Sequence, residues 1–156
     1  MNDLVMQKQI EISSLTGNSL RLDGGSMFGN APKILWQKWI PADEKNLIPI
    51  ASRSMLVRVG KDCILFETGC GAWFSPELKA RYMVVESDHI LLKSLEKVGL
   101  SHKDITFIVL SHLHFDHAGG LLKQWTPQSS KPELLFPNAK VIAGRENIER
   151  SRQPHF

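Results

Sequence analysis

Short hydrophobic runs separated by polar and glycine-containing segments predict a chain that mixes strands and helices. The run at 107–110, Phe-Ile-Val-Leu, is flanked by polar residues and indicates a buried strand. The run at 63–66 is nearly continuous and indicates a second strand, buried on both faces. Residues 88–98 place Leu91 and Leu95 on one helical face, which predicts a helix that ends at Gly99 in a left-handed residue.

The N-terminal part carries a strand pattern. Residues 5–15 mix alternating apolar positions with polar ones, and the turn signal at 16–18 predicts a hairpin into residues 19–22. A second alternating segment at 48–59 predicts another strand. It leads through a tight turn at Gly60 into the apolar run described above.

Between these strands the pattern changes. Residues 23–29 form a glycine-rich stretch without the Gly-Lys-Ser/Thr of a phosphate loop, so we expect a simple loop. Residues 32–40 predict a helix, with Leu35, Trp36 and Trp39 on one face. We expect this face to pack into the core, with contact to a substrate as the alternative.

The C-terminal part predicts three elements. Leu121, Leu122 and Trp125 continue a helix up to Pro127. Residues 141–142 form a short strand, and residues 145–150 begin a helix.

Length and charge exclude several classes. The 156 residues amount to one domain, and the net charge of +3 comes without a block of lysines and arginines, so we expect no nucleic-acid partner. The mixed, polar N-terminus and the absence of an apolar run of about 18 residues predict a cytoplasmic protein without signal peptide or membrane segment. Cys63 and Cys70 read as reduced thiols, with a bridge across a tight turn as the alternative.

Candidate chemistry directly follows the buried strand at 107–110. Three imidazoles and one carboxylate occur within six residues: His112, His114, Asp116 and His117. Such groups bind Zn, Mn, Fe, Co or Ni. His112 and His114 are two apart, so in an extended segment they point to the same side. The adjacent Asp116 and His117 point differently, which suits a second metal ion. The alternative is a surface loop that happens to be rich in histidine.

The segment HLHFDH at 112–117, followed by AGG at 118–120, resembles the signature of metallo-β-lactamase-fold hydrolases. The form SHLHFDHAGG is most similar to the branch with acyl-homoserine-lactone lactonases and related small-ester hydrolases. The resemblance implies that His112 and His114 bind one metal ion and that Asp116 and His117 bind the other. Asp116 would also carry a proton to the leaving group. Two zinc ions are implied for a complete site, with Mn, Fe, Co or Ni as alternatives.

The implied fold is an α/β architecture, a four-layer αβ/βα sandwich in which two sheets pack face to face. Residues 1–156 correspond to about its N-terminal half, as a single incomplete domain, and the family's later ligands lie beyond them. We therefore expect one apolar sheet face to lack its partner layer and to promote self-association. Its candidate residues are Ile64, Phe66, Ile108 and Leu110.

The resemblance also implies roles outside the motif. The strand at 63–66 ends in Glu67, where the family has an aspartate whose hydrogen bonds support the metal site; the longer side chain departs from that pattern. Met27 and Phe28 lie in the segment that borders the family's substrate pocket. They form an apolar wall there or simply pack within the loop.

Together these features predict a metal-dependent hydrolase that uses a metal-bound hydroxide on a lactone or other small ester. One alternative is a truncated, non-catalytic homologue. Another is a hydrolase of the same fold that acts on a thioester, phosphoester or β-lactam, because the motif specifies the metal site and not the acyl group.

Overall fold

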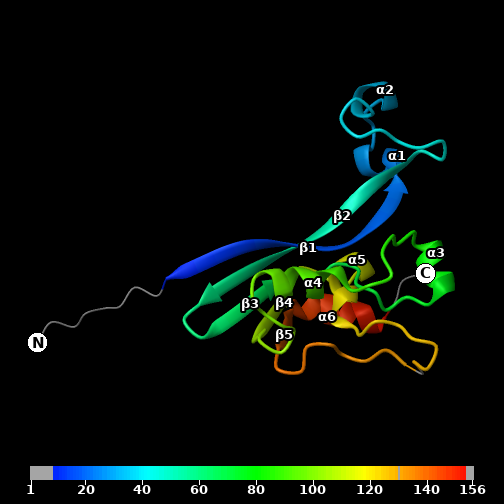
Figure 1. Ribbon diagram of the computed structural model, residues 1–156. Helices are drawn as coiled ribbons and strands as arrows, with labels where there is room; N and C mark the ends of the chain where they lie inside the picture. The colour runs from blue at the N-terminus through cyan, green and yellow to red at the C-terminus, as the bar shows by residue number, and fades with distance from the viewer. Residues whose placement is uncertain (1–8, 130, 154–156) are drawn as a thin grey trace, which may run out of the picture.

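The structure, a computed structural model, describes residues 9–129 and 131–153. Its centre is one five-stranded sheet whose strand order follows the chain (Figure 1). The strands are β1 (Ile10–Asp23), β2 (Leu47–Val59), β3 (Asp62–Phe66), β4 (Phe107–Leu110) and β5 (Lys140–Ala143). The first three pair antiparallel, whereas β3–β4 and β4–β5 are parallel. This mixed α/β arrangement agrees with the expected fold class.

The described residues also form six short helices and one 3-10 turn, all of them between strands except the last helix, which follows β5. They are α1 (Gly24–Phe28), α2 (Lys33–Trp36), α3 (Pro76–Arg81), α4 (Ile90–Lys97), α5 (Phe115–Ala118), η1 (Gly119–Leu121) and α6 (Arg145–Arg152). Among the described residues, no helix has the length and apolar character needed to cross a bilayer.

One face of the sheet carries the hydrophobic core. Leu91 and Leu95 of α4 are fully buried against it, and the core includes Leu56, Leu65 and Ile108 from three neighbouring strands. Burial of such side chains contributes roughly 1.5–3 kcal/mol each. The core therefore fixes β3, which leads to Glu67, and β4, which leads into the histidine motif.

The opposite face of the sheet is apolar and less covered. Strand register aligns its residues in two rows across the sheet, Ile12–Val57–Ile64–Phe107 and Met55–Phe66–Val109–Ile142. Met55 is 40% exposed and Ile142 is 48% exposed. Ile64 and Phe66 thus lie on the open face, as expected. Ile108 and Leu110 do not, because the alternation of β4 turns them toward α4, where both are buried.

The expected hairpin at 16–18 is wrong. Thr16 and Ser19 lie within one continuous strand, β1, with a register shift between them. The reason is tertiary: Asn18 is fully buried, donates from Nδ2 to the Asp88 carbonyl and accepts from the Ile90 amide at 3.1 Å. Asn18 therefore lies in a β-bulge and not in a turn, because the N-terminal end of α4 binds its side chain. The part of the predicted first strand before residue 9 lies outside the described residues.

The same contact changes the start of α4. The N-cap of α4 is His89, whose own side chain makes no capping bond. The Asn18 side chain, which is remote in sequence, serves the first free amide instead. The C-terminal prediction is confirmed: Gly99 has φ +75°, and the Leu100 amide donates to the Leu95 carbonyl at 3.0 Å.

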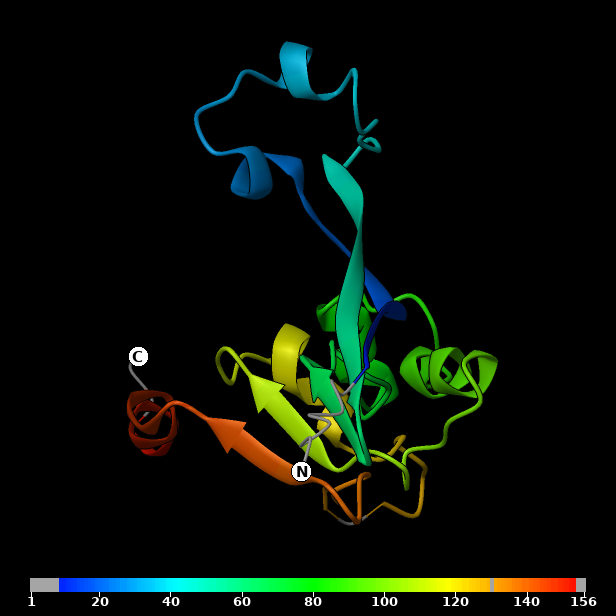
Figure 2. The same cartoon turned by 90° about the vertical axis from the view of Figure 1, so that its left-hand side faces the viewer.

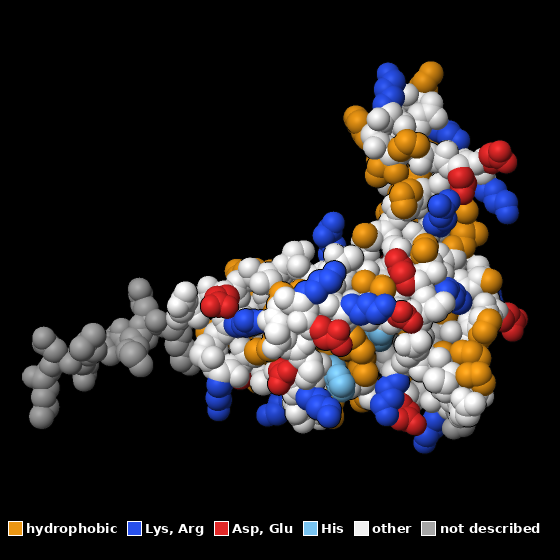
Figure 3. Space-filling view, viewed as in Figure 1, with side chains coloured by type: hydrophobic (Ala, Val, Ile, Leu, Met, Phe, Trp, Pro, Cys, Tyr) orange, Lys and Arg blue, Asp and Glu red, His pale blue; other side chains and the backbone are white. Residues whose placement is uncertain are grey.

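The far ends of β1 and β2 carry an arm, residues 24–46, that stands away from the rest of the molecule (Figure 2). The glycine-rich stretch at 23–29 is α1 and not a loop, because Asp23 caps it by accepting from the Ser26 amide. Within the arm Gly24 and Trp36 are buried. Leu35 and Trp39 are exposed, so their predicted core role is wrong. The helix at 32–40 ends after one turn, and apolar side chains gather at the tip of the arm (Figure 3).

The expected helix through Trp125 also fails. The chain leaves helical geometry after Leu121, because the backbone at Gly119 and Gly120 packs directly on the backbone of the segment after β3. A Cβ added to Gly120 would lie 2.1 Å from the Thr68 carbonyl oxygen. The strand at 141–142 and the helix from Arg145 are confirmed, and the two cysteines are free.

Candidate metal centre

The parallel pairing of β3 and β4 determines where the motif lies. The carboxyl ends of parallel neighbours meet at one edge of a sheet, and ligand sites form there in α/β folds. β3 ends at Phe66 and β4 at Leu110, and the Glu67 amide still pairs with the Val109 carbonyl at 3.0 Å. The residues after both strands therefore lie together.

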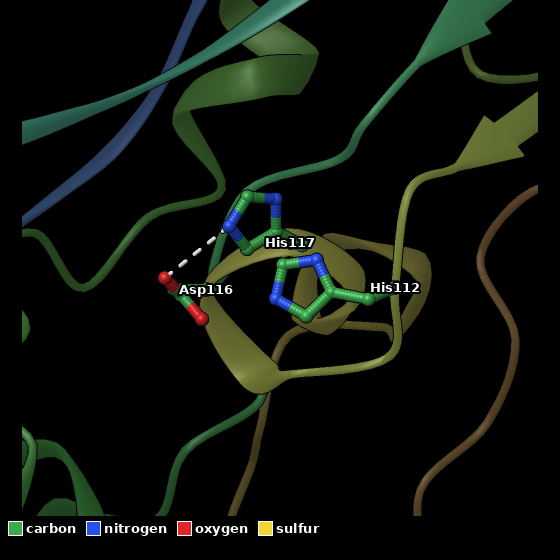
Figure 4. A group of neighbouring side chains, drawn as sticks. All are labelled: His112, Asp116 and His117. Atoms are coloured by element: carbon green, nitrogen blue, oxygen red, sulfur yellow. Dashed lines mark ion pairs between the residues drawn. The ribbon is translucent and has the colours of Figure 1, made fainter. Parts of the chain in front are cut away.

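Three donor side chains converge at this edge (Figure 4). Ligand atoms of His112, Asp116 and His117 all lie within 4.8 Å of one another. His112 comes from the loop after β4, whereas Asp116 and His117 come from the single turn of α5. The His117 Nε2 and Asp116 Oδ2 atoms are 3.5 Å apart. The predicted convergence of these three residues is present in the fold.

His114 lies beside the group without belonging to it. Its ring centroid is 4.6 Å from that of His112, while the His112 and His117 centroids are 4.0 Å apart. Thus His112 contacts both other imidazoles. The pairing implied by the resemblance, His112 with His114 and Asp116 with His117, stays a prediction.

Glu67 links the two strand ends. Its Oε1 accepts from the Ser111 amide at 2.8 Å, and its Oε2 lies 3.2 Å from His117 Nδ1. With a proton on Nδ1 facing the carboxylate, Nε2 keeps its lone pair toward Asp116 and is available to a metal ion. The resemblance pointed to Glu67, but not to its backbone, which has φ +62°. That left-handed conformation, uncommon in residues other than glycine, ends β3 and brings Glu67 to His117.

Thr68 holds the backbone of His117, whereas Glu67 contacts its ring. It is fully buried, and both its amide and its hydroxyl donate to the His117 carbonyl at 2.9 Å. Sequence reasoning assigned Thr68 no role. The available signal was its position directly after Glu67, at the end of a predicted strand. The chain turns there, so a hydroxyl side chain can hydrogen-bond to a neighbouring loop.

A small cavity of about 260 Å³ opens beside the candidate metal ligands. Its lining combines Glu67, Asp116 and His117 with apolar residues, including Met27 and Ile50, and with Arg53. Phe28 does not line this cavity; it stacks on Trp36 with ring centroids 5.0 Å apart. Sequence reasoning missed Arg53. It alternates with Met55 and Val57 on one strand face, so a cation on an otherwise apolar face was the signal.

The donor set fits a divalent transition metal. Zinc accepts imidazole nitrogen and carboxylate oxygen, and two ligands bonded at about 2.0–2.1 Å and a tetrahedral angle lie about 3.3–3.4 Å apart. The 3.5 Å between His117 Nε2 and Asp116 Oδ2 is close to that value. The Glu67–His117 contact is of the kind that orients metal-binding histidines.

Comparisons with known proteins agree with this chemistry. The chain is 34% identical to the N-acyl homoserine lactonase AiiB of Agrobacterium fabrum, over 64% of this chain and 38% of that protein. The enzyme of the same name from Rhizobium rhizogenes matches to the same extent. The chain thus spans well under half the length of these curated relatives.

Solved structures show the same fold. A probable metal-dependent hydrolase from Staphylococcus aureus superposes with a TM-score of 0.80 at 30% identity, covering 96% of this chain and 52% of that one. AidC, a dizinc quorum-quenching lactonase in complex with its product, gives 0.66 at 27% identity, covering 96% and 48%. Residues 47–124, which carry Glu67 and the whole histidine motif, match the family description Metallo-beta-lactamase superfamily. The chain belongs to the metallo-beta-lactamase superfamily.

Proposed function

We propose that this chain contributes the metal centre of a hydrolase that opens lactones or other small esters. The observation that carries the proposal is the group formed by His112, Asp116 and His117, with Glu67 bonded behind His117. The lactonase names of AiiB and AidC support a lactone over a thioester, phosphoester or β-lactam.

His112, His114, Asp116 and His117 would hold the metal, with zinc favoured by the nitrogen and oxygen donors and by the dizinc relative. When bound, the metal supplies Lewis-acid polarisation of the substrate carbonyl and activates a water molecule. Glu67 would keep the His117 ring oriented through Nδ1 and so leave the Nε2 lone pair free to bind a metal ion. Asp116 lines the cavity and has a second carboxylate oxygen, so it is placed to carry a proton to the leaving alkoxide.

The cavity suggests how a substrate lies. Met27, Leu22 and Ile50 offer an apolar wall for an alkyl or acyl group beside the donors. Arg53, at the same cavity, would donate a hydrogen bond to an ester or amide carbonyl oxygen. This arrangement suits a neutral, partly apolar ester.

The described donors form a sparse site for two metal ions. Catalytic zinc has three protein ligands as a rule, and four side chains shared between two ions fall short of that number. We therefore expect the 156-residue chain by itself to bind zinc weakly and to turn over lactones slowly, unless a second chain or further residues complete the site.

Zinc titration and lactone turnover test the proposal. The chain should bind zinc and release acid from an N-acyl homoserine lactone, followed with a pH indicator. His112→Asn and Asp116→Asn should abolish both signals. His102→Asn is the matched control, because His102 packs edge-on against Phe136 outside the donor group.

Two results would contradict the proposal. One is zinc binding that survives both substitutions at the donors. The other is a form that is fully loaded with zinc, completed by further residues, and inert toward every lactone and ester tried, which would leave a non-catalytic homologue.

A further inference from the structure

We propose that His89 is a positioning residue. It ties the segment 112–120, here called the metal loop because it carries the candidate ligands, to the hydrophobic core. His89 is 4% exposed and lies at the N-terminus of α4, distant in sequence from the motif. Its Nε2 atom lies 3.0 Å from the carbonyl oxygen of Gly120, three residues after His117. It makes no capping bond to its own helix.

The chemistry of this contact fixes the state of the ring. A carbonyl oxygen only accepts, so Nε2 carries the proton and donates it. Nδ1 then keeps a lone pair, and within the described part of the chain this buried atom has no hydrogen-bond partner. Burial lowers the pKa of His89, which is in accord with a neutral ring. An unpaired buried nitrogen costs free energy, and an apolar side chain of the same size would avoid that cost. The specific contribution of the histidine is therefore its hydrogen bond to Gly120.

Gly120 is held from several directions. Its amide donates to the Gly69 carbonyl at 2.8 Å, its carbonyl accepts from His89, and its Cα packs against Thr68 so closely that no side chain fits. Thr68 in turn binds the His117 carbonyl through two hydrogen bonds. A continuous path of contacts therefore runs from His89 through Gly120 and Thr68 to His117.

The tether matters because the metal loop has little stability of its own. α5, which presents Asp116 and His117, is a single turn of four residues, and isolated helices of that length do not form. α4, by contrast, is anchored by Leu91 and Leu95 in the core. His89 connects α4, which is held in the core, to the loop that contains α5. Such support from a rigid element keeps the side chains of a functional site in place.

The predicted effect of His89 on metal affinity rests on the metal site proposed above, whereas its hydrogen bond to the metal loop does not. The stability of the loop and the affinity for zinc are therefore measured separately, with the variants His89→Leu, His89→Gln and Ser94→Ala. Leucine keeps the bulk and loses the donor, while glutamine restores an amide donor at a similar reach. Ser94→Ala is the matched control, since the Ser94 hydroxyl ties the same helix to the Thr16 carbonyl at 2.7 Å, a bond to β1 instead of the metal loop.

The first measurement is amide hydrogen exchange in the metal-free chain. In His89→Leu the amides of Thr68 and Gly120, which donate to His117 and Gly69, should exchange at least about tenfold faster than in Ser94→Ala. The second is zinc affinity by competition with a chelator. It should fall roughly 10–100-fold in His89→Leu, recover substantially in His89→Gln and stay unchanged in Ser94→Ala.

Each outcome decides the proposal. It is overturned if exchange at Thr68 and Gly120 in His89→Leu does not exceed that in Ser94→Ala, or if both variants weaken zinc binding equally. Should His89→Leu fail to fold, failure of the folded His89→Gln variant to keep protection at these amides overturns it equally. If the unmodified chain binds no zinc, the proposed function fails, and the exchange measurement still decides the tether.

Discussion

The Glu67 carboxylate lies 3.2 Å from Nδ1 of His117 although fifty residues separate the two along the chain. Parallel pairing of β3 with β4 brings the two strand ends together, and the left-handed backbone of Glu67 turns its side chain to the motif. The extra methylene relative to aspartate is accommodated, because both carboxylate oxygens have partners. This contact is the most direct target for mutation.

Glu67→Gln should weaken zinc binding by roughly 10–100-fold, because a neutral amide polarises the His117 ring less than a carboxylate does. Isothermal titration with zinc measures the change. Glu133→Gln is the matched control: Glu133 pairs with Lys123 at 2.7 Å on the surface, and its loss should leave the affinity unchanged. Equal zinc affinity in both variants would show that Glu67 only ends a strand and does not support metal binding.

Asn18→Ala should lower the free energy of unfolding by about 1–3 kcal/mol, since the Ile90 amide loses its cap and the Asp88 carbonyl loses a donor. Urea denaturation measures it. Asn138→Ala removes one exposed bond to the Lys103 carbonyl and should cost less than about 0.5 kcal/mol. Similar losses in the two variants would show that Asn18 does not anchor α4.

Self-association should occur through the open sheet face. Ile142→Lys places a charge on that face and should shift sedimentation toward the monomer, because an ion buried in an apolar contact is costly. Val141→Lys is its neighbour on the opposite face, with similar exposure, and should leave sedimentation unchanged. A monomeric unmodified chain at high concentration would contradict the prediction.

The stability of the protein should fall below pH 6.5, in part through His89. Burial lowers the pKa of His89 from its ordinary value of 6.5, so below that pH the unfolded chain binds a proton that the folded chain does not. The free energy of unfolding therefore decreases as pH falls from 6.5 to the folded pKa, by at most about 1.4 kcal/mol per pH unit from this group.

Urea unfolding at pH 7 and pH 5 tests this pH dependence. His89→Gln does not titrate, so it should lose less stability between the two pH values than the unmodified chain. Ser94→Ala, which changes no titrating group, should lose as much as the unmodified chain. An identical loss in His89→Gln would exclude His89 as a source.

The sequence determined several local elements and the candidate donors. Periodicity placed α4 and its glycine end, the apolar runs placed β3 and β4, and the motif named His112, Asp116 and His117. These features depend on residues that are neighbours in the chain, so their physical basis is readable without the fold.

Tertiary contacts decided what local patterns could not. Asn18 reads as a turn residue until α4 binds its side chain, and then it lies in a bulge. Gly119 and Gly120 end the helix after the motif, because the facing backbone comes too close for any side chain. His89 carries no local signal for its bond to Gly120. Each of these outcomes depends on a partner far away in sequence, and only the packed structure brings such partners within hydrogen-bond distance.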